Sequence, residues 1–356
     1  MNLVTQTCAA IQQVDHAAGR LAQKILDDKT KPRGSLGVLE SLACRLAAIY
    51  GRADPGLPAK AIVVMAADHG VAQEGVSAYP AEVTEQMLHN FVRGGAAINV
   101  LARQVEAKVV VVNMGTKGRD KEATRQETVV HDARLGPGTA NFAHGPAMSM
   151  AQALQGMETG IRIATNLCAS GIGLIGVGEM GIGNTTAASA LTVVFTGEAP
   201  ERVTGRGTGI DDATWNHKIE IIKKALAVNQ PSRDHPIEVL AKLGGFELAG
   251  LVGVMLGAAS LKVPIVLDGF ITGAAALVGV GLCPRVRDYL IASHQSVEPG
   301  HRRLLEHLEL KPLLNLDLRL GEGTGAALAM HLVEAALRIT REMSTFTSAG
   351  VTNTGA

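Results

Sequence analysis

The chain has 356 residues, of which 47% are apolar and 19% are charged. This globular composition excludes a disordered, collagenous or coiled-coil protein, and the length is enough to bury a sizeable core. Because 33 basic residues balance 33 acidic ones and only one Trp, three Tyr and six Phe are present, we expect no nucleic-acid partner. The 41 glycines favour tight turns and close approach to a ligand, as in an enzyme that acts on small molecules.

The sequence does not indicate a membrane partner or a secreted protein. The first sixteen residues lack the basic-then-apolar layout of a signal peptide, and the richest apolar stretch, residues 248–282, is interrupted by Lys262 and Asp268. Each uninterrupted piece is shorter than the roughly 20 residues that span a bilayer. The four cysteines form no CxxC pair, so we expect free thiols in a reducing cytoplasm.

The first sixty residues predict two amphipathic helices, over residues 11–26 and 36–50. A Pro/Gly loop, residues 29–37, separates them, and residues 52–60 are typical of a linker into the next unit. The chain is therefore expected to begin with a helical part that precedes its first strand.

Five short apolar runs follow, each ending in glycine or polar residues, with helical segments between them. They are Ala61–Gly70, Lys108–Gly115, Ile172–Gly181, Val263–Gly269 and Tyr289–Ser296. Such runs predict a mainly parallel sheet covered on both faces, in a doubly wound α/β domain. Ligands bind beyond the carboxyl ends of such strands, where this sequence places DHG, NMG, GEMGIGNTT, LDG and SHQS. From Leu318, a Gly-rich loop and an amphipathic helix follow, and the last ten residues are expected to fray.

The segment GVGEMG, residues 176–181, matches the GxGxxG pattern of dinucleotide-binding folds and suggests an NAD-dependent dehydrogenase. Two features argue against that interpretation. Glu179 would face a pyrophosphate from inside the turn, and the acids about twenty residues on, Glu198 and Glu201, lie in a Pro-containing loop and not at a strand end. We therefore interpret the match as accidental.

The longer segment GEMGIGNTTAASAL favours a phosphate site. Gly181 and Gly183 allow a close turn, and the three polar residues that follow are expected to cap a helix beginning at Ala187; they are Asn184, Thr185 and Thr186. Free amides at a helix start bind a phosphate monoester. The alternative is an ordinary capped helix after a tight turn. Glu179, just before the loop, is suited to ribose hydroxyls or to a developing positive charge.

Glu322 lies between Gly321 and Gly323 at the start of the last helix. Its carboxylate could serve only as a partner of the helix dipole, or it could act as a general base that the flanking glycines leave open to a substrate. The spacing does not decide between the two interpretations.

Three other polar features have a plain explanation. Asp68-His69 and His294 follow strands, but no HxH, HExxH or carboxylate cluster accompanies them, so we expect no metal and interpret them as residues that order loops. Lys218 is expected to be a surface lysine, unless the preceding GRGTGIDD loop folds over the site.

Ten motifs, taken together, identify a family. They are KPRGSLG, ADHGV, EGVSAYPAEVTEQM, GGAAINVLAR, NFAHGPAMS, GEMGIGNTT, GGFELAGLVGVMLGAA, LDGF, SHQS and LGEGTGAALAM. In this order the chain resembles the nicotinate-nucleotide:dimethylbenzimidazole phosphoribosyltransferases, usually called CobT, from about Lys31 to Met330. One departure is Asn113, where the family is expected to favour Asp.

The resemblance implies a Rossmann-like sheet that does not bind NAD, a small helical domain formed by both chain ends, and a homodimer whose partner subunit helps to close each site. We accordingly expect a helical part over residues 1–60, an α/β catalytic domain over residues 61–330, and a C-terminal helix with a frayed tail over residues 331–356.

The resemblance also implies a reaction: nicotinate mononucleotide and 5,6-dimethylbenzimidazole give α-ribazole 5′-phosphate and nicotinate, without metal or redox cofactor. Glu322 is then the catalytic base and Glu179 a second site carboxylate. The remaining expected contacts fall into two groups. For the 5′-phosphate they are Gly181, Gly183, Asn184, Thr185 and Lys218, and for the base pocket Tyr79, Pro80, Gln86 and Met87. The alternatives are the dehydrogenase and a non-catalytic nucleotide-binding protein.

Overall fold

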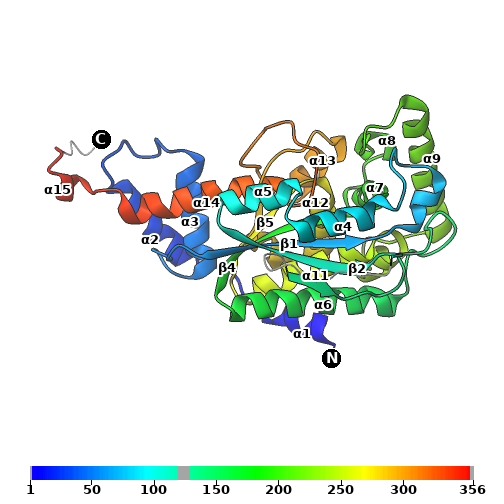
Figure 1. The fold of residues 1–356 in the computed structure, drawn as a ribbon. Helices are drawn as coiled ribbons and strands as arrows, with labels where there is room; N and C mark the ends of the chain where they lie inside the picture. Colours follow the sequence, from blue (N-terminus) through cyan, green and yellow to red (C-terminus); the bar gives the residue numbers. More distant parts are fainter. Residues whose placement is uncertain (1, 119–128, 353–356) are drawn as a thin grey trace.

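A computed structural model describes residues 2–118 and 129–352 of the chain. Within these residues a six-stranded parallel sheet runs through the middle of the molecule, with helices on both faces (Figure 1). The strands are β1 (Ala59–Ala67), β2 (Ala107–Gly115), β3 (Val129–Asp132), β4 (Ile172–Met180), β5 (Ile265–Leu267) and β6 (Leu290–Ala292). This architecture confirms the predicted doubly wound α/β fold.

The order of the strands, β3-β2-β1-β4-β5-β6, determines where a ligand can bind. The chain moves outward from β1 to β3 and then returns to place β4 on the other side of β1. The crossovers therefore diverge between β1 and β4, and a crevice opens at the carboxyl ends of these two strands. Each of the five predicted runs overlaps a strand, and β1 and β2 begin two residues and one residue before their runs. β3 was not predicted, because it has only four residues and lies at the sheet edge.

The helices cover both faces of the sheet. They are α1 (Leu3–Ala10), α2 (His16–Asp27), α3 (Val38–Tyr50), α4 (Val83–Arg93), α5 (Ala97–Gln104), α6 (Met150–Ala169), α7 (Asn184–Thr196), α8 (Pro200–Val203), α9 (Asp212–Asn229), α10 (Pro236–Leu243), α11 (Phe246–Ser260), α12 (Phe270–Leu282), α13 (Pro299–His307), α14 (Thr324–Glu342) and α15 (Phe346–Ala349). Helices α4, α5 and α14 contact one face, and α6 and α11 the other.

Strand β1 shows why these runs are continuously apolar. Ile62 and Val64 join the hydrophobic core under α4, α5 and α14, whereas Val63 and Met65 join the core under α6 and α11. A strand buried on both faces has no position for a polar side chain until it reaches its end. None of the helices among the described residues is long and apolar enough to cross a membrane.

Helices from the first and last parts of the chain meet beside the sheet, where α2 and α3 lie against α14 (Figure 1). Lys29 Nζ donates a hydrogen bond to the carbonyl oxygen of Met343 at 2.6 Å, and the amide of Thr30 donates to the carbonyl oxygen of Ser344 at 3.1 Å. α1 lies elsewhere and packs against α6 and α11. The division at residues 60 and 330 stays a prediction.

Two details of the chain ends differ from the sequence expectation. The predicted helix over residues 11–26 is wrong in its first part, because Asp15 caps α2 by accepting the amides of Ala17 and Ala18. Within the tail that was expected to fray, the structure has the short helix α15, and residues 353–356 lie outside the described part.

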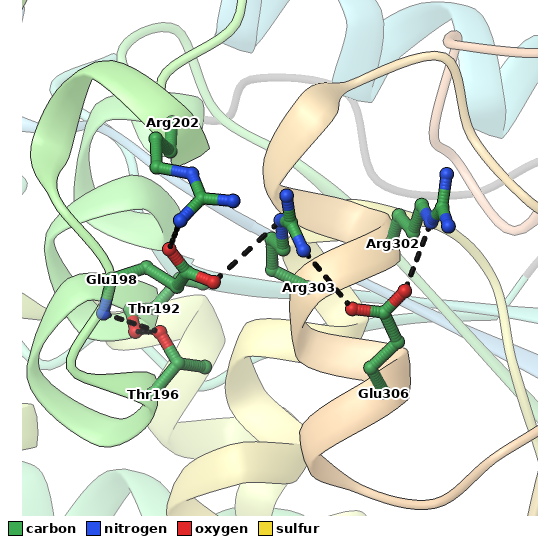
Figure 2. A network of polar contacts seen from close by, with 7 residues as sticks. All are labelled: Thr192, Thr196, Glu198, Arg202, Arg302, Arg303 and Glu306. Atoms are coloured by element: carbon green, nitrogen blue, oxygen red, sulfur yellow. Dashed lines mark hydrogen bonds and ion pairs between the residues drawn. The ribbon is translucent and has the colours of Figure 1, made fainter.

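A network of ion pairs connects the α7–α8 corner to α13 (Figure 2). Glu198 lies 3.0 Å from Arg202 of α8 and 3.6 Å from Arg303 of α13, and Arg303 also pairs with Glu306 at 3.3 Å. Each exposed pair stabilises the fold by at most about 1 kcal/mol. The network nevertheless joins two elements that flank the loops over the site described below: α8 precedes residues 204–211, and α13 follows residues 293–298.

Candidate active site

A cavity of about 460 Å³ lies where β4, β5 and β6 end, beside the point at which the crossovers diverge. Its lining comes from within residues 77–87, 179–185, 207–208, 269–271, 294–298 and 319–322. The loops after three strands and the loop before α14 therefore form one site, as the strand order requires.

A buried carboxylate, Glu179, lies at the floor of the cavity at the end of β4. Burial raises its pKa well above the usual range, and the charges of Asp268 and Glu247 add to this effect. Asn184 Nδ2 donates a hydrogen bond to Glu179 Oε2 and partly opposes the rise. A strongly raised pKa in a cleft is typical of a functional carboxyl group.

The second carboxylate, Glu322, is held in a strained loop. Its φ is +64°, and Gly321 and Gly323 on either side have φ values of +87° and +92°. A non-glycine residue in this region is uncommon and requires support from its surroundings. Glu322 lines the cavity, and burial raises the pKa of its carboxyl group.

Asp268, after β5, supplies that support. Its carboxylate accepts the amides of Gly323 at 3.0 Å, Gly325 at 2.7 Å and Ala326 at 3.3 Å, at the start of α14. Burial raises the pKa of Asp268 to about 7, although the three amides oppose the rise. On the sheet side, a Cβ on Gly178 would overlap the backbone of Glu322, so this position requires glycine.

The opposite end of the cavity lies at the start of α7. Gly183, with φ +95°, occupies the N-cap position, and no side chain caps the helix. The expectation that residues 184–186 cap a helix starting at Ala187 is therefore wrong: the helix begins at Asn184, whose side chain turns back to Glu179. The amides of Asn184 and Thr186 donate to the carbonyl oxygens of Gly181 and Gly183 at 3.0 and 2.9 Å. No side chain covers this helix start, and residues 181–185 line the cavity, so the positive end of the helix dipole lies at the cavity and is suited to an anion.

Lys218 of α9 is buried beside this helix start, with 1% of its surface exposed. Its Nζ donates a hydrogen bond to Thr185 Oγ1 at 2.8 Å. Burial lowers the pKa of Lys218 to about 8, and the charge of Glu298 opposes that shift. The expectation that Lys218 lies at the surface is wrong, because the loop before α9 folds over it. Glu298 holds that loop by accepting the amide of Gly207 at 2.9 Å.

The other polar strand ends have structural partners. His69 Nε2 lies 2.5 Å from Glu247 Oε1 in a buried pair, and Asp68 Oδ2 accepts the amide of Lys117 at 2.8 Å. Asn113 accepts the amides of Gly115 and Thr116 at the carboxyl end of β2. Over residues 2–118 and 129–352, no three His, Cys, Asp or Glu side chains are grouped as metal ligands.

Comparison with known proteins identifies the family. A phosphoribosyltransferase family model matches residues 11–351. Relatives from Geobacter metallireducens and Chloroflexus aggregans, both named nicotinate-nucleotide–dimethylbenzimidazole phosphoribosyltransferase, are 52% and 53% identical over 351 residues; each match covers 99% of this chain and 98% of the relative. The chain belongs to this phosphoribosyltransferase family. The crystal structure of CobT from Thermus thermophilus is 47% identical, with a TM-score of 0.90 over 95% of this chain and 99% of that one.

The family assignment confirms the resemblance and the prediction of a transferase. The GxGxxG match that suggested a dehydrogenase is not a dinucleotide-binding turn. Gly176 and Gly178 lie inside β4 and not in the turn that would hold a pyrophosphate.

The structure brings most of the predicted site residues together. Those that line the cavity are Tyr79, Met87, Glu179, Gly181, Gly183, Asn184, Thr185 and Glu322. Lys218 joins them through Thr185. Pro80 and Gln86 are exposed and lie outside the lining, although Val83 and Met87, one turn apart on α4, belong to it.

Several residues of the site were not among the predicted site residues, and three of them hold other parts of the site or take part in the argument below: Asp268, His294 and Glu298. Asp268 and His294 lie one and two residues after the ends of β5 and β6, and that position is the signal by which they could have been selected. Glu298 gives no such signal, because its importance comes from a loop ninety-one residues away in the sequence.

Proposed function

We propose that this protein transfers the phosphoribosyl group of nicotinate mononucleotide to 5,6-dimethylbenzimidazole, giving α-ribazole 5′-phosphate and nicotinate for the lower ligand of cobalamin. The named relatives support the reaction. One structural observation carries the proposal: a single cavity has a strained, buried carboxylate at one end and an uncapped helix start with a buried lysine at the other.

The chemistry fits these groups. One benzimidazole nitrogen attacks C1′ of the ribose, while the bond from C1′ to the nicotinate nitrogen breaks and its electron pair stays on that nitrogen. Nicotinate needs no general acid, because its nitrogen is already positively charged in the nucleotide. The attacking base loses the proton of its other nitrogen, and a positioned carboxylate can accept that proton.

We assign this role to Glu322. The strained loop, held by Asp268, directs a carboxylate with a raised pKa into the cavity, where it is a stronger base than an exposed glutamate. Glu179 is proposed as the second carboxyl group, close to the ribose, where it can stabilise positive charge that develops at C1′.

We assign the 5′-phosphate to the opposite end. The amides around Gly181, Gly183 and Asn184 lie at the start of α7, and Lys218 and Thr185 supply a cation and a hydroxyl group. The base pocket is proposed at Tyr79 and Met87, with Val83 between them. Pro80 and Gln86, on the same segment, remain predicted contacts of the base.

A homodimer is proposed as well. Tyr79 and Leu320 line the cavity and yet are 56% and 57% exposed, so a second subunit could cover apolar surface at the mouth. Light scattering of the purified protein tests this. The cytoplasm is proposed as its location, because Cys8, Cys44, Cys168 and Cys283 are all free thiols.

The decisive experiment is a turnover assay with nicotinate mononucleotide and a panel of bases: benzimidazoles, purines and phenolics. We expect release of nicotinate only in the presence of a base, with 5,6-dimethylbenzimidazole among those accepted. Binding of the nucleotide without nicotinate release would support a non-catalytic protein. Tight NADH binding, seen by fluorescence, without nicotinate release would support a dehydrogenase.

A further inference from the structure

His294 is a cavity residue to which the proposed mechanism assigns no role. It follows β6, lines the cavity and has only 2% of its surface exposed. The imidazole ring lies close to two glycines, Gly269 and Gly325, at which a side chain would meet the ring. The ring of His301 lies behind it, with 6.0 Å between ring centroids. The ring of His294 is therefore held in one orientation.

The hydrogen bonds of Ser293 determine which nitrogen of His294 carries the proton. Ser293 Oγ donates to the carbonyl oxygen of Asp268 at 2.8 Å and lies 3.0 Å from His294 Nδ1. A hydroxyl group has one proton, and the carbonyl oxygen can only accept it. Nδ1 must therefore be the donor to Ser293, and Nε2 carries a lone pair.

No hydrogen bond joins Nε2 to any of the described residues. Nε2 is also not one of their fully buried unpartnered atoms, so it is accessible at the cavity that His294 lines. Burial lowers the pKa of His294 to about 4, so the ring stays neutral at physiological pH and Nε2 does not become a donor. Such a low pKa also makes the ring a poor general base. An accessible acceptor on an otherwise buried side chain at a cavity wall is suited to a ligand hydroxyl or N–H group.

The position of His294 in the cavity indicates whether the donor is a hydroxyl group or an N–H group. Gly325, on one side of the ring, lies in the first turn of α14, directly after the loop that contains Glu322. On the other side, the same segment continues to Glu298, which holds Gly207 over Lys218. The ring thus lies between the proposed base end and the proposed phosphate end, where a nucleotide has its sugar.

We propose that His294 Nε2 accepts a hydrogen bond from a ribose hydroxyl group of the nucleotide and so makes the site selective for ribonucleotides over deoxyribonucleotides. The inference rests on the proposed function, because the sugar is placed by the phosphate and base ends of that reaction. Ser293 is the positioning residue that keeps the lone pair on Nε2.

The test compares nicotinate mononucleotide with its 2′-deoxy and 3′-deoxy analogues, at saturating 5,6-dimethylbenzimidazole, by kcat/KM and by the Kd of each nucleotide alone. We expect the wild-type protein to prefer the ribonucleotide over one analogue by about tenfold beyond their intrinsic reactivity. His294→Ala should remove that preference by losing activity with the ribonucleotide only. His294→Gln, whose amide oxygen can replace Nε2, should retain part of it. Intrinsic reactivity cancels, because the comparison is between variants.

Two further variants provide a control and a second, independent test of the hydrogen bond. His331→Ala, at an exposed position of α14, should keep the wild-type preference. Ser293→Ala leaves the ring in place and frees the proton of Nδ1, so it should weaken the preference even if His294→Ala does not fold. An equal loss for all three nucleotides, or a loss confined to the KM of the benzimidazole, would overturn the inference alone. A wild-type protein that neither binds the nucleotide nor releases nicotinate would overturn the proposed function as well.

Discussion

The two ends of the cavity are built by opposite electrostatic means. At the start of α7, backbone amides and Lys218 provide positive potential, whereas at the start of α14 the carboxylate of Asp268 occupies the amides and directs Glu322 into the cavity. Both helices begin after a glycine with a positive φ, yet one start is left open for an anion and the other is filled by the protein's own anion. The proposed function therefore assigns different chemistry to two similar sequence patterns, GIGN and GEGT, because different groups lie opposite each helix start.

Glu322→Gln tests the carboxylate end of the cavity and should have the largest effect on activity of the variants considered. The amide keeps the shape of the side chain and loses its basicity, so we expect kcat to fall by about 10²–10⁴-fold. The Kd of nicotinate mononucleotide, measured by calorimetry, should stay nearly unchanged. Glu342→Gln, at the exposed far end of α14, is the control and should keep its kcat. Turnover close to wild type in Glu322→Gln would remove Glu322 from the mechanism.

Lys218→Met tests the opposite end. The variant keeps an apolar stem in the buried position and loses the cation, and hydrogen bonds to charged groups contribute about 1.5–3 kcal/mol. We expect the KM for the nucleotide to rise by about 10–100-fold, with a smaller change in kcat. Lys224→Met, on the exposed side of α9, is the matched control. A larger change in the KM of the benzimidazole would place the phosphate elsewhere.

Gly183→Val should weaken binding of the nucleotide by about tenfold. A β-branched residue is poorly tolerated at φ +95° and would crowd the bound phosphate. The comparison variant is Gly197→Val, because Gly197 ends the same helix with φ +75° and has open space around it. Both variants should lose stability in thermal unfolding, but only Gly183→Val should change the KM for the nucleotide. Equal losses for both substrates in a folded Gly183→Val protein would contradict the assignment.

The pH profile of kcat/KM for the nucleotide should show both ends at once, with changes of a few-fold per pH unit. Burial raises the pKa of Glu322, so the basic form appears only as pH rises through that value, and the acid limb should lie above the usual range of a glutamate. Burial lowers the pKa of Lys218 to about 8, so the cation is lost as pH rises through about 8. Glu322→Gln should flatten the acid limb, and Lys218→Met should flatten the basic limb. If each variant flattened the other limb, the roles proposed for the two residues would have to be exchanged.

Chelation should have the smallest effect. The proposed step moves one proton and one phosphoribosyl group between groups already present, so we expect EDTA to leave kcat and both KM values unchanged. Loss of activity with EDTA and recovery with one divalent ion would show that a metal shares one of the two ends.

The sequence indicated the residues of the proposed phosphate end more directly than those of the carboxylate end. Glycines and a helix start are local features, so the sequence alone indicated Gly181 and Gly183 as phosphate contacts. It also indicated Glu322 as a candidate, but only the family resemblance gave Glu322 the role of base. The role of Asn184 could not, because its capping position competes with a hydrogen bond to Glu179 that appears only when β4 and α7 meet.

Some features are local in the sequence: continuous apolar runs, their polar ends and the helical periodicity between them. They were enough to predict a parallel sheet with its site at the carboxyl edge. The burial of Lys218, the support of Glu322 by Asp268 and the lone pair on His294 depend on contacts between residues 25 to 57 positions apart or on loops farther still. Such contacts form only when the strands take their order in the sheet, since hydrophobic patterning places a strand in the core but does not specify which neighbour it pairs with.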